Sequence, residues 1–218
     1  MLQHHLIYAA FAVAAYLVGA IPFGYLFVKL RTGKDVRTLG SGNIGATNVA
    51  RVLGTAWFVP VFVLDFLKGF APVFWAAPWV AARWPCAICD HLPAALAVLF
   101  GLFAMLGHMF PVYLKFRGGK GVATVAGVLF AMNWMAILVG LGAWILVFLP
   151  SRYVSLASIA SAIAVPVAHH FTAARVGMRS WIVTLFFVMA CLLVIVRHRG
   201  NIRRLLAGTE IRAGRKAA

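Results

Sequence analysis

Long apolar segments alternate with short polar segments along the whole chain. All but one of the apolar segments approach or exceed the roughly 20 residues that cross a bilayer as a helix. The pattern therefore predicts an all-α integral membrane protein with seven transmembrane helices. Their expected ranges are Leu6–Leu30, Gly54–Val80, Leu92–Phe110, Val122–Met132, Trp134–Leu149, Val154–Phe171 and Ser180–Val196.

Two of these apolar segments contain a break. Pro22 lies inside the first segment, which is long enough to span the membrane with a tilt or a kink at the proline. The run from Val122 to Leu149 is too long for one ordinary span. Because Asn133 and Trp134 offer a polar break with an interfacial aromatic residue, we divide this run into one short helix and one fuller helix.

Composition and charge agree with a membrane protein. Of 218 residues, 64% are hydrophobic and 11% charged, and the mean hydropathy is +0.96, whereas soluble domains are about half apolar and a quarter charged. The net charge of +16 alone could indicate nucleic-acid binding, but the basic residues lie almost entirely in the short connections. The first apolar run lacks a basic n-region and is too long for a cleaved signal, so it is expected to be a helix.

The distribution of basic residues predicts the topology. With seven helices and the N-terminus outside, the inner connections and the C-terminal tail hold sixteen Lys and Arg residues, and the outer side holds three. The positive-inside rule favours this arrangement, with a cytoplasmic C-terminus. We expect one membrane-embedded domain, residues 1–218, in which residues 197–218 form a basic cytoplasmic tail.

Three polar, glycine-rich segments lie between the apolar runs and are expected to face the cytoplasm together. We call them the first island (Gly40–Arg51, GSGNIGATNVAR), the second island (Phe116–Thr124, FRGGKGVAT) and the third island (His198–Glu210, HRGNIRRLLAGTE). They contain too few bulky apolar residues to build a core. Their common side of the membrane predicts one polar site.

The second island has the composition of an anion site. Its glycines permit tight turns and uncovered amides, Lys120 supplies a cation, and a helix begins directly afterwards. It is not a Walker A loop, since G-x-x-x-x-G-K-[ST] is absent. A glycine-rich interfacial turn with snorkelling lysines is the simpler alternative.

The first and third islands offer polar groups suited to phosphates and hydroxyls. Ser41 and the other neutral polar residues of the first island can donate and accept hydrogen bonds, and Arg51 can bind a phosphate in bidentate fashion. A serine N-cap before a short helix, with Arg51 as a topology charge, remains an alternative. His198 and Asn201 share one face if the last helix continues, and His198 is either a general base or incidental.

Few acidic residues and cysteines exist. With four Asp and Glu, a carboxylate metal cage is hard to assemble. Asp65 and Lys68 are one helical turn apart in the second span, and we favour a structural pair over a role for Lys68 in the anion site. Cys86 and Cys89 form a C-x-x-C without a second ligand pair, which favours a loop disulfide or an incidental pair over a zinc site.

The three islands resemble the signature motifs of a known family. GSGNIGATNVAR, GHMFPVYLKFRGGKGVAT (Gly107–Thr124) and HRGNIRRLLAGTE are similar to those of the bacterial membrane acyl-phosphate:glycerol-3-phosphate acyltransferases, as is VLDFLKG (Val63–Gly69). The resemblance runs from about Leu6 to Glu210. Arg117 stands where lysine is common. The H-x-x-x-x-D motif of other glycerolipid acyltransferases is absent, which agrees with this separate family.

The resemblance implies a seven-helix enzyme of the bacterial inner membrane, with its active site facing the cytoplasm. Such an enzyme transfers a fatty acyl group from acyl phosphate to the sn-1 hydroxyl of glycerol 3-phosphate, giving lysophosphatidic acid and phosphate for phospholipid biosynthesis. It implies no metal, no thioester donor and no covalent cofactor. The partners are then the two substrates and membrane lipid, without nucleic acid. Acyl-chain preference and oligomeric state stay open, with a monomer as the working assumption.

The resemblance also implies which residues act. The expected catalytic residues are Ser41, Arg51, Lys120 and His198. The residues expected to bind substrate or phosphate are Asn43, Thr47, Asn48, Gly118, Gly119, Gly121 and Asn201, with Lys68 as a further candidate.

The expected mechanism is direct attack of the substrate hydroxyl on the acyl carbonyl. Basic groups offset the repulsion between two phosphates, and the proton goes to His198 or to the phosphate of glycerol 3-phosphate. Ser41 as an acylated nucleophile is the alternative, although no Ser-His-Asp arrangement is evident. Small residues such as Ala46, Gly127 and Ala131 could leave room for the acyl chain.

Two other classes of function fit parts of the pattern. A basic, glycine-rich cytoplasmic mouth could belong to an organophosphate transporter or an anion channel. No internal repeat supports a transporter, however, and the islands lie at one face instead of mid-membrane. The tail from Arg197 to Lys216 could also bind anionic lipid or nucleic acid, alone or beside the enzymatic function.

Overall fold

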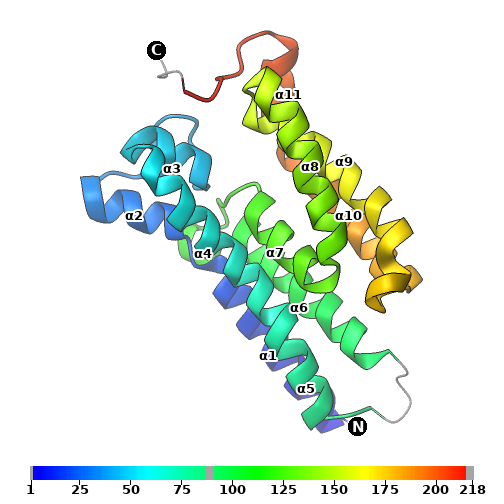
Figure 1. The fold of residues 1–218 in the computed structure, drawn as a ribbon. Coiled ribbons are helices and arrows are strands. Elements are labelled where there is room, and N and C mark those ends of the chain that lie inside the picture. The colour runs from blue at the N-terminus through cyan, green and yellow to red at the C-terminus, as the bar shows by residue number, and fades with distance from the viewer. Residues whose placement is uncertain (1, 87–90, 215–218) are drawn as a thin grey trace. The chain divides into compact units, whose positions relative to one another are not determined.

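The computed structural model describes residues 2–86 and 91–214, and every regular element in these ranges is helical. The chain divides into two compact units, Met1–Met132 and Asn133–Ala218, which Figure 1 shows in blue to green and in green to red. The first and second islands belong to unit 1, and the third island belongs to unit 2.

The described part of unit 1 contains seven α-helices. α1 packs along α6, α4 packs along α7, and α6 also contacts α7 (Figure 1). A π-helical turn, Pro72–Ala76, joins α4 to α5. The helices are α1 (Leu2–Ala20), α2 (Phe23–Thr32), α3 (Ala46–Leu53), α4 (Phe58–Ala71), α5 (Ala77–Arg83), α6 (Leu92–Met109) and α7 (Val122–Met132).

Glycines allow the long helices of unit 1 to approach closely. A side chain at Gly19 of α1 would collide with the Ala104 carbonyl of α6, and one at Gly127 of α7 would collide with the Phe66 carbonyl of α4. Small residues at such crossings favour helix association in a bilayer, where lipid is as apolar as leucine. The space beside Gly127 is therefore filled by α4 and does not hold an acyl chain, contrary to expectation.

Unit 2 consists of α8 (Trp134–Ser151), α9 (Val154–Thr172), α10 (Trp181–Arg197) and α11 (Arg199–Leu206). α9 packs against both α8 and α10 (Figure 1). The polar break predicted at Asn133 is confirmed. Its side chain caps α8 by accepting a hydrogen bond from the Ala136 N–H at 3.1 Å, and it reaches Thr172 of α9 at 2.9 Å.

The predicted membrane character is confirmed, and the count of spans is smaller than expected. In the described ranges, five helical segments are long and apolar enough to cross a bilayer, and a sixth is added if α10 and α11 form one bent span. The short helix α7 has eleven residues, fewer than a straight crossing needs. Seven spans and the orientation of the termini therefore stay predictions.

The first span is interrupted at the expected proline. α1 ends at Ala20 and α2 begins at Phe23, while Gln3–Thr32 as a whole is one candidate span. Proline lacks the N–H that would continue the helical bonding. In the connection between the second and third expected spans, Cys86 is disulfide-bonded. Cys89, the other cysteine of the C-x-x-C, lies outside the described residues.

Candidate active site

The first island forms a loop that leads into α3. Gly45 is the N-cap of α3, and the Asn43 Oδ1 accepts a hydrogen bond from the Gly45 N–H at 2.8 Å. The short helix expected after this loop is present, but Ser41 is exposed four residues before the cap. The alternative that Ser41 serves as an N-cap is therefore wrong.

Asn48 organises this loop from within. Its side chain is 1% exposed; its Oδ1 accepts a hydrogen bond from the Ser41 N–H at 2.7 Å. Its Nδ2 donates to the carbonyl oxygens of Asn43 at 2.9 Å and Leu39 at 3.0 Å. Asn48 was expected to contact substrate, whereas the structure directs both ends of its amide to the backbone.

An apolar cluster fixes the underside of the first island. It contains Val28 of α2, Val36 of the following connection, Ile44 of the first island, Val49 of α3 and Val61 of α4, all of them buried. α2 comes so close that a side chain at Gly24 would collide with the Ile44 carbonyl. Of the polar residues of the island, Ser41 is exposed and Asn43 and Thr47 are half-buried.

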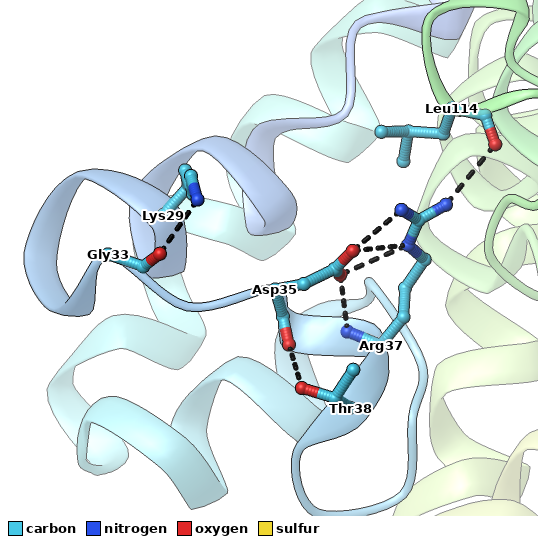
Figure 2. Close-up of polar contacts among 6 residues, drawn as sticks. All are labelled: Lys29, Gly33, Asp35, Arg37, Thr38 and Leu114. Atoms are coloured by element: carbon cyan, nitrogen blue, oxygen red, sulfur yellow. Dashed lines mark hydrogen bonds and ion pairs between the residues drawn. The ribbon is translucent and has the colours of Figure 1, made fainter.

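A clasp of charged side chains ties the connection before the first island to the segment before the second (Figure 2). The Arg37 guanidinium pairs with the Asp35 carboxylate at 2.6 Å and donates to the Leu114 carbonyl at 3.3 Å. The hydrogen bond from Arg37 is the main cause that lowers the pKa of Asp35, and Asp35 in turn raises the pKa of Arg37. In the sequence, Arg37 is one of the basic residues of the inner connections, whose distribution predicts only the topology.

The second island wraps around the C-terminal end of α6. The Gly119 N–H donates to the His108 carbonyl at 3.2 Å, and a side chain at Gly119 would collide with the His108 ring. A side chain at Gly118 would meet the His108 and Met109 carbonyls. Close approach is therefore the reason for these two glycines, while Gly121 is the one with a positive φ, 86°.

This packing changes the role of one predicted phosphate ligand. The Gly119 amide, expected to hold phosphate, is already bonded to His108. Lys120 is half-buried and stands two residues before α7, whose first turn carries no acidic residue. A cation placed before a helix N-terminus is suited to an anion, and phosphate binding by Lys120 stays a prediction.

The charges inside α4 form a buried cluster with α6. Lys68 Nζ lies 2.7 Å from Asp65 Oδ1, which confirms the favoured structural pair, and it donates to the Ile21 carbonyl at 2.8 Å. His108 Nδ1 lies 3.7 Å from the same carboxylate oxygen. These two contacts use two of the three N–H donors of the Lys68 ammonium.

In unit 2, the helix does not continue straight through the third island. α10 and α11 meet at His198 with a bend of 54°, so the condition under which His198 and Asn201 would share the face of one continuous helix is not met. His198 and Asn201 are nevertheless both buried. The His198 Nδ1 lies 2.8 Å from the Val194 carbonyl; since a carbonyl only accepts, Nδ1–H is the donor in this contact.

Glu210 holds the third island together. Its carboxylate accepts hydrogen bonds from Asn201 at 2.6 Å, from Ser155 at 2.7 Å and from Arg204 at 2.7 Å. Burial raises the pKa of Glu210, but these hydrogen bonds outweigh it and the net pKa is lowered. Asn201, expected to bind substrate, thus has a structural partner as well.

Sequence reasoning gave no role to His108 or Glu210. Both lie inside the motif segments that carry the family resemblance. A histidine in the last turn of an apolar span, next to a glycine loop, was the available signal, because buried ionisable groups in a membrane are costly. Within the described ranges, no three His, Cys, Asp or Glu side chains gather as metal ligands.

The fold defines an all-helical, multi-pass membrane protein, and two of its three basic, glycine-rich islands belong to unit 1. Residues 9–208 match the Glycerol-3-phosphate acyltransferase family. The chain is 43% identical to the glycerol-3-phosphate acyltransferase of Mesorhizobium japonicum, covering 94% of this chain and 95% of that protein. The chain therefore belongs to this family, whose members act in phospholipid synthesis.

Further relatives agree in sequence and in structure. The enzyme of Aquifex aeolicus is 42% identical over 92% of this chain and 96% of its own length. A crystal structure of the integral membrane glycerol 3-phosphate acyltransferase PlsY, in its glycerol 3-phosphate form, aligns with a TM-score of 0.80 and 42% identity over 95% of this chain and 96% of that chain. Its lysophosphatidic acid form aligns at 0.77 with 40% identity, covering 95% of each chain.

Proposed function

We propose that this protein transfers a fatty acyl group from acyl phosphate to the sn-1 hydroxyl of glycerol 3-phosphate, releasing lysophosphatidic acid and phosphate. We place it in the bacterial inner membrane with its site facing the cytoplasm. The match of residues 9–208 to the family, which spans nearly all of the three islands, is the observation that carries the proposal. The glycerol 3-phosphate and lysophosphatidic acid forms of the related PlsY structures support the acceptor and the product.

The basic residues of unit 1 suit the charge of the reaction. Two phosphate-bearing substrates repel each other, and each pair of unit charges 4 Å apart interacts by about 4 kcal/mol at an effective dielectric constant of 20. Arg51, in the last turn of α3, and Lys120 supply the opposing charge. Ser41, Asn43 and Thr47 supply neutral donors and acceptors for the glycerol backbone.

The chemical step is direct. The sn-1 oxygen attacks the acyl carbonyl carbon, the bond from that carbon to the phosphate oxygen breaks, and inorganic phosphate leaves. The hydroxyl proton goes to His198 or to the phosphate of glycerol 3-phosphate. The Nδ1–H bond to Val194 orients the His198 ring, and an imidazole that is neutral with this tautomer would accept the proton on Nε2.

Two further residues of the expected site, Asn48 and Asn201, form hydrogen bonds within the protein. Asn48 fixes the shape of the first island, and Glu210 fixes Asn201 in unit 2. We keep the Gly118 and Gly121 amides as phosphate ligands. A site shared by the third island and the first two remains a prediction.

The test is an assay of the purified protein in lipid nanodiscs with radiolabelled glycerol 3-phosphate, in the presence of a chelator. Acyl phosphate, acyl-CoA and acyl carrier protein thioester are compared as donors. We expect equal amounts of lysophosphatidic acid and phosphate from acyl phosphate alone, and losses of about 10²-fold or more in Lys120→Ala and His198→Ala. Lysophosphatidic acid formed from a thioester would refute acyl phosphate as the specific donor. Uptake of glycerol 3-phosphate into sealed proteoliposomes without lipid formation would indicate a transporter.

A further inference from the structure

Unit 1 contains a buried cluster of three ionisable side chains that the proposed chemistry does not use. Asp65, Lys68 and His108 have side-chain exposures of 4%, 2% and 4%. The Asp65 carboxylate lies between the two basic groups, 2.7 Å from Lys68 Nζ and 3.7 Å from His108 Nδ1. Burying charged groups is costly, and well-packed apolar residues of similar volume are often as stable, so stability alone gives little reason for the cluster.

One end of the cluster supports the second island. The His108 carbonyl accepts a hydrogen bond from the Gly119 N–H at 3.2 Å. Its ring lies where a Gly119 side chain would be, so the loop rests directly on the imidazole. Lys120 follows in the next position. Both the carbonyl and the ring of His108 therefore lie against the residue that precedes Lys120.

The other end supports the segment that leads to the first island. Lys68 donates to the Ile21 carbonyl at 2.8 Å and lies over the Phe23 ring at 5.6 Å, at the break between α1 and α2. α2 in turn packs against the first island, because Gly24 touches the Ile44 carbonyl. One carboxylate thus joins the supports of both islands in unit 1.

We propose that Asp65, Lys68 and His108 are positioning residues, which hold the Gly118–Gly121 loop and its lysine in a fixed place relative to the first island. The three groups act through Lys120 and do not touch the reacting atoms. That Lys120 binds a substrate phosphate rests on the proposed function; the placement of the loop does not.

The decisive variant is His108→Leu, which keeps the Asp65–Lys68 pair and the approximate side-chain volume. We expect faster hydrogen–deuterium exchange in the peptide that covers residues 116–124, with an unchanged melting temperature. A catalytic group shifted by about 1 Å can cost roughly 10²-fold, and we expect a kcat/KM loss of this order, mostly in the KM for glycerol 3-phosphate. His108→Asn, whose amide can still donate toward Asp65, should restore part of it.

A double variant separates positioning from general damage. If His108 acts through Lys120, then His108→Leu with Lys120→Ala is no less active than Lys120→Ala alone. Thr124→Val is the matched control in the same island, because the buried Thr124 hydroxyl has no hydrogen-bond partner in the described ranges; its exchange and kinetics should equal those of the wild type.

The outcomes are distinct. Wild-type exchange in His108→Leu, or losses that multiply with those of Lys120→Ala, would overturn the inference. Faster loop exchange in a protein whose wild type transfers no acyl group would support the positioning cluster and refute the proposed function. If His108→Leu does not fold, the double variant Asp65→Asn/Lys68→Met replaces it, because it removes the carboxylate and the ammonium of the cluster without changing the net charge. Loop exchange and kcat/KM are then measured in that variant.

Discussion

The Asn48 side chain accepts a hydrogen bond from the backbone N–H of Ser41 across seven residues of the first island, at 2.7 Å. A residue expected to meet substrate is therefore the internal support of the loop that carries the exposed serine. The same relationship explains Gly40, which has φ 56° and where a side chain would collide with the Asn48 Oδ1.

Asn48→Asp should damage the loop more than Asn48→Ala. Alanine removes the hydrogen bonds and should lower the free energy of unfolding by about 2–3 kcal/mol. Aspartate keeps an acceptor for the Ser41 N–H but places a buried carboxylate against the Leu39 and Asn43 carbonyls. Melting followed by tryptophan fluorescence measures both, and an Asn48→Asp protein as stable as wild type would contradict the assigned bonds.

Gly118→Ala should be more harmful than Gly119→Ala. The methyl group at Gly118 meets backbone carbonyls that cannot move easily, whereas the one at Gly119 meets a side chain; overpacking of this kind costs about 1–3 kcal/mol. Gly142→Ala in α8 is the control, since nothing lies within 4 Å of the added atom. The losses of melting temperature and of acyl-transfer activity should be smallest for Gly142→Ala, larger for Gly119→Ala and largest for Gly118→Ala.

The Asp35–Arg37 clasp should contribute stability at neutral pH that disappears in acid. Arg37 lowers the pKa of Asp35, so the contribution is complete above the ordinary aspartate pKa and is lost as the pH falls through the lower folded value. Because the pair is partly exposed, we expect at most about 1 kcal/mol. Asp35→Asn should remove this part of the pH dependence; a variant whose stability falls in acid just as the wild type does would argue against the clasp.

Arg37→Lys tests the geometry of the same clasp at constant charge. Lysine cannot reproduce the fork that binds both Asp35 and the Leu114 carbonyl (Figure 2). We expect a raised KM for glycerol 3-phosphate with little loss of stability. Exchange measured on residues 111–117 should rise in this variant, and an unchanged rate there would show that the Leu114 bond is unimportant.

Glu210→Ala should release the third island. It leaves the buried Asn201 and Ser155 without their acceptor, at a cost of about 2–3 kcal/mol. The buried thiol of Cys191 in α10 provides a reporter, because a thiol-reactive dye labels it only when unit 2 opens. Ser155→Ala, which removes one of three bonds, is the milder control, and equal effects of the two variants would contradict the network.

The pH dependence of this network has the same sign as that of Asp35. The net pKa of Glu210 is lowered because its hydrogen bonds outweigh the effect of burial. Its stabilisation is therefore complete above the ordinary glutamate pKa and falls as the pH drops through the folded value. Dye labelling of Cys191 over acidic pH should show a transition that Glu210→Gln lacks.

The sequence by itself determined the membrane class, the positions of the apolar helices, the polar break at Asn133 and the family. These follow from local properties, since the length and hydropathy of a segment decide whether it crosses lipid, and the three motifs are contiguous. The pair between Asp65 and Lys68 was also predictable, because one helical turn separates the two residues.

Only the tertiary structure decided which polar groups face inward. Asn48 turns to the loop backbone, Gly119 rests on His108, and the chain bends at His198 instead of continuing as one helix. Each depends on residues distant in sequence or on a local choice between competing hydrogen bonds. The energy differences between such choices are small compared with the hydrophobic term that places the helices, so the pattern of apolar and polar residues does not reveal them.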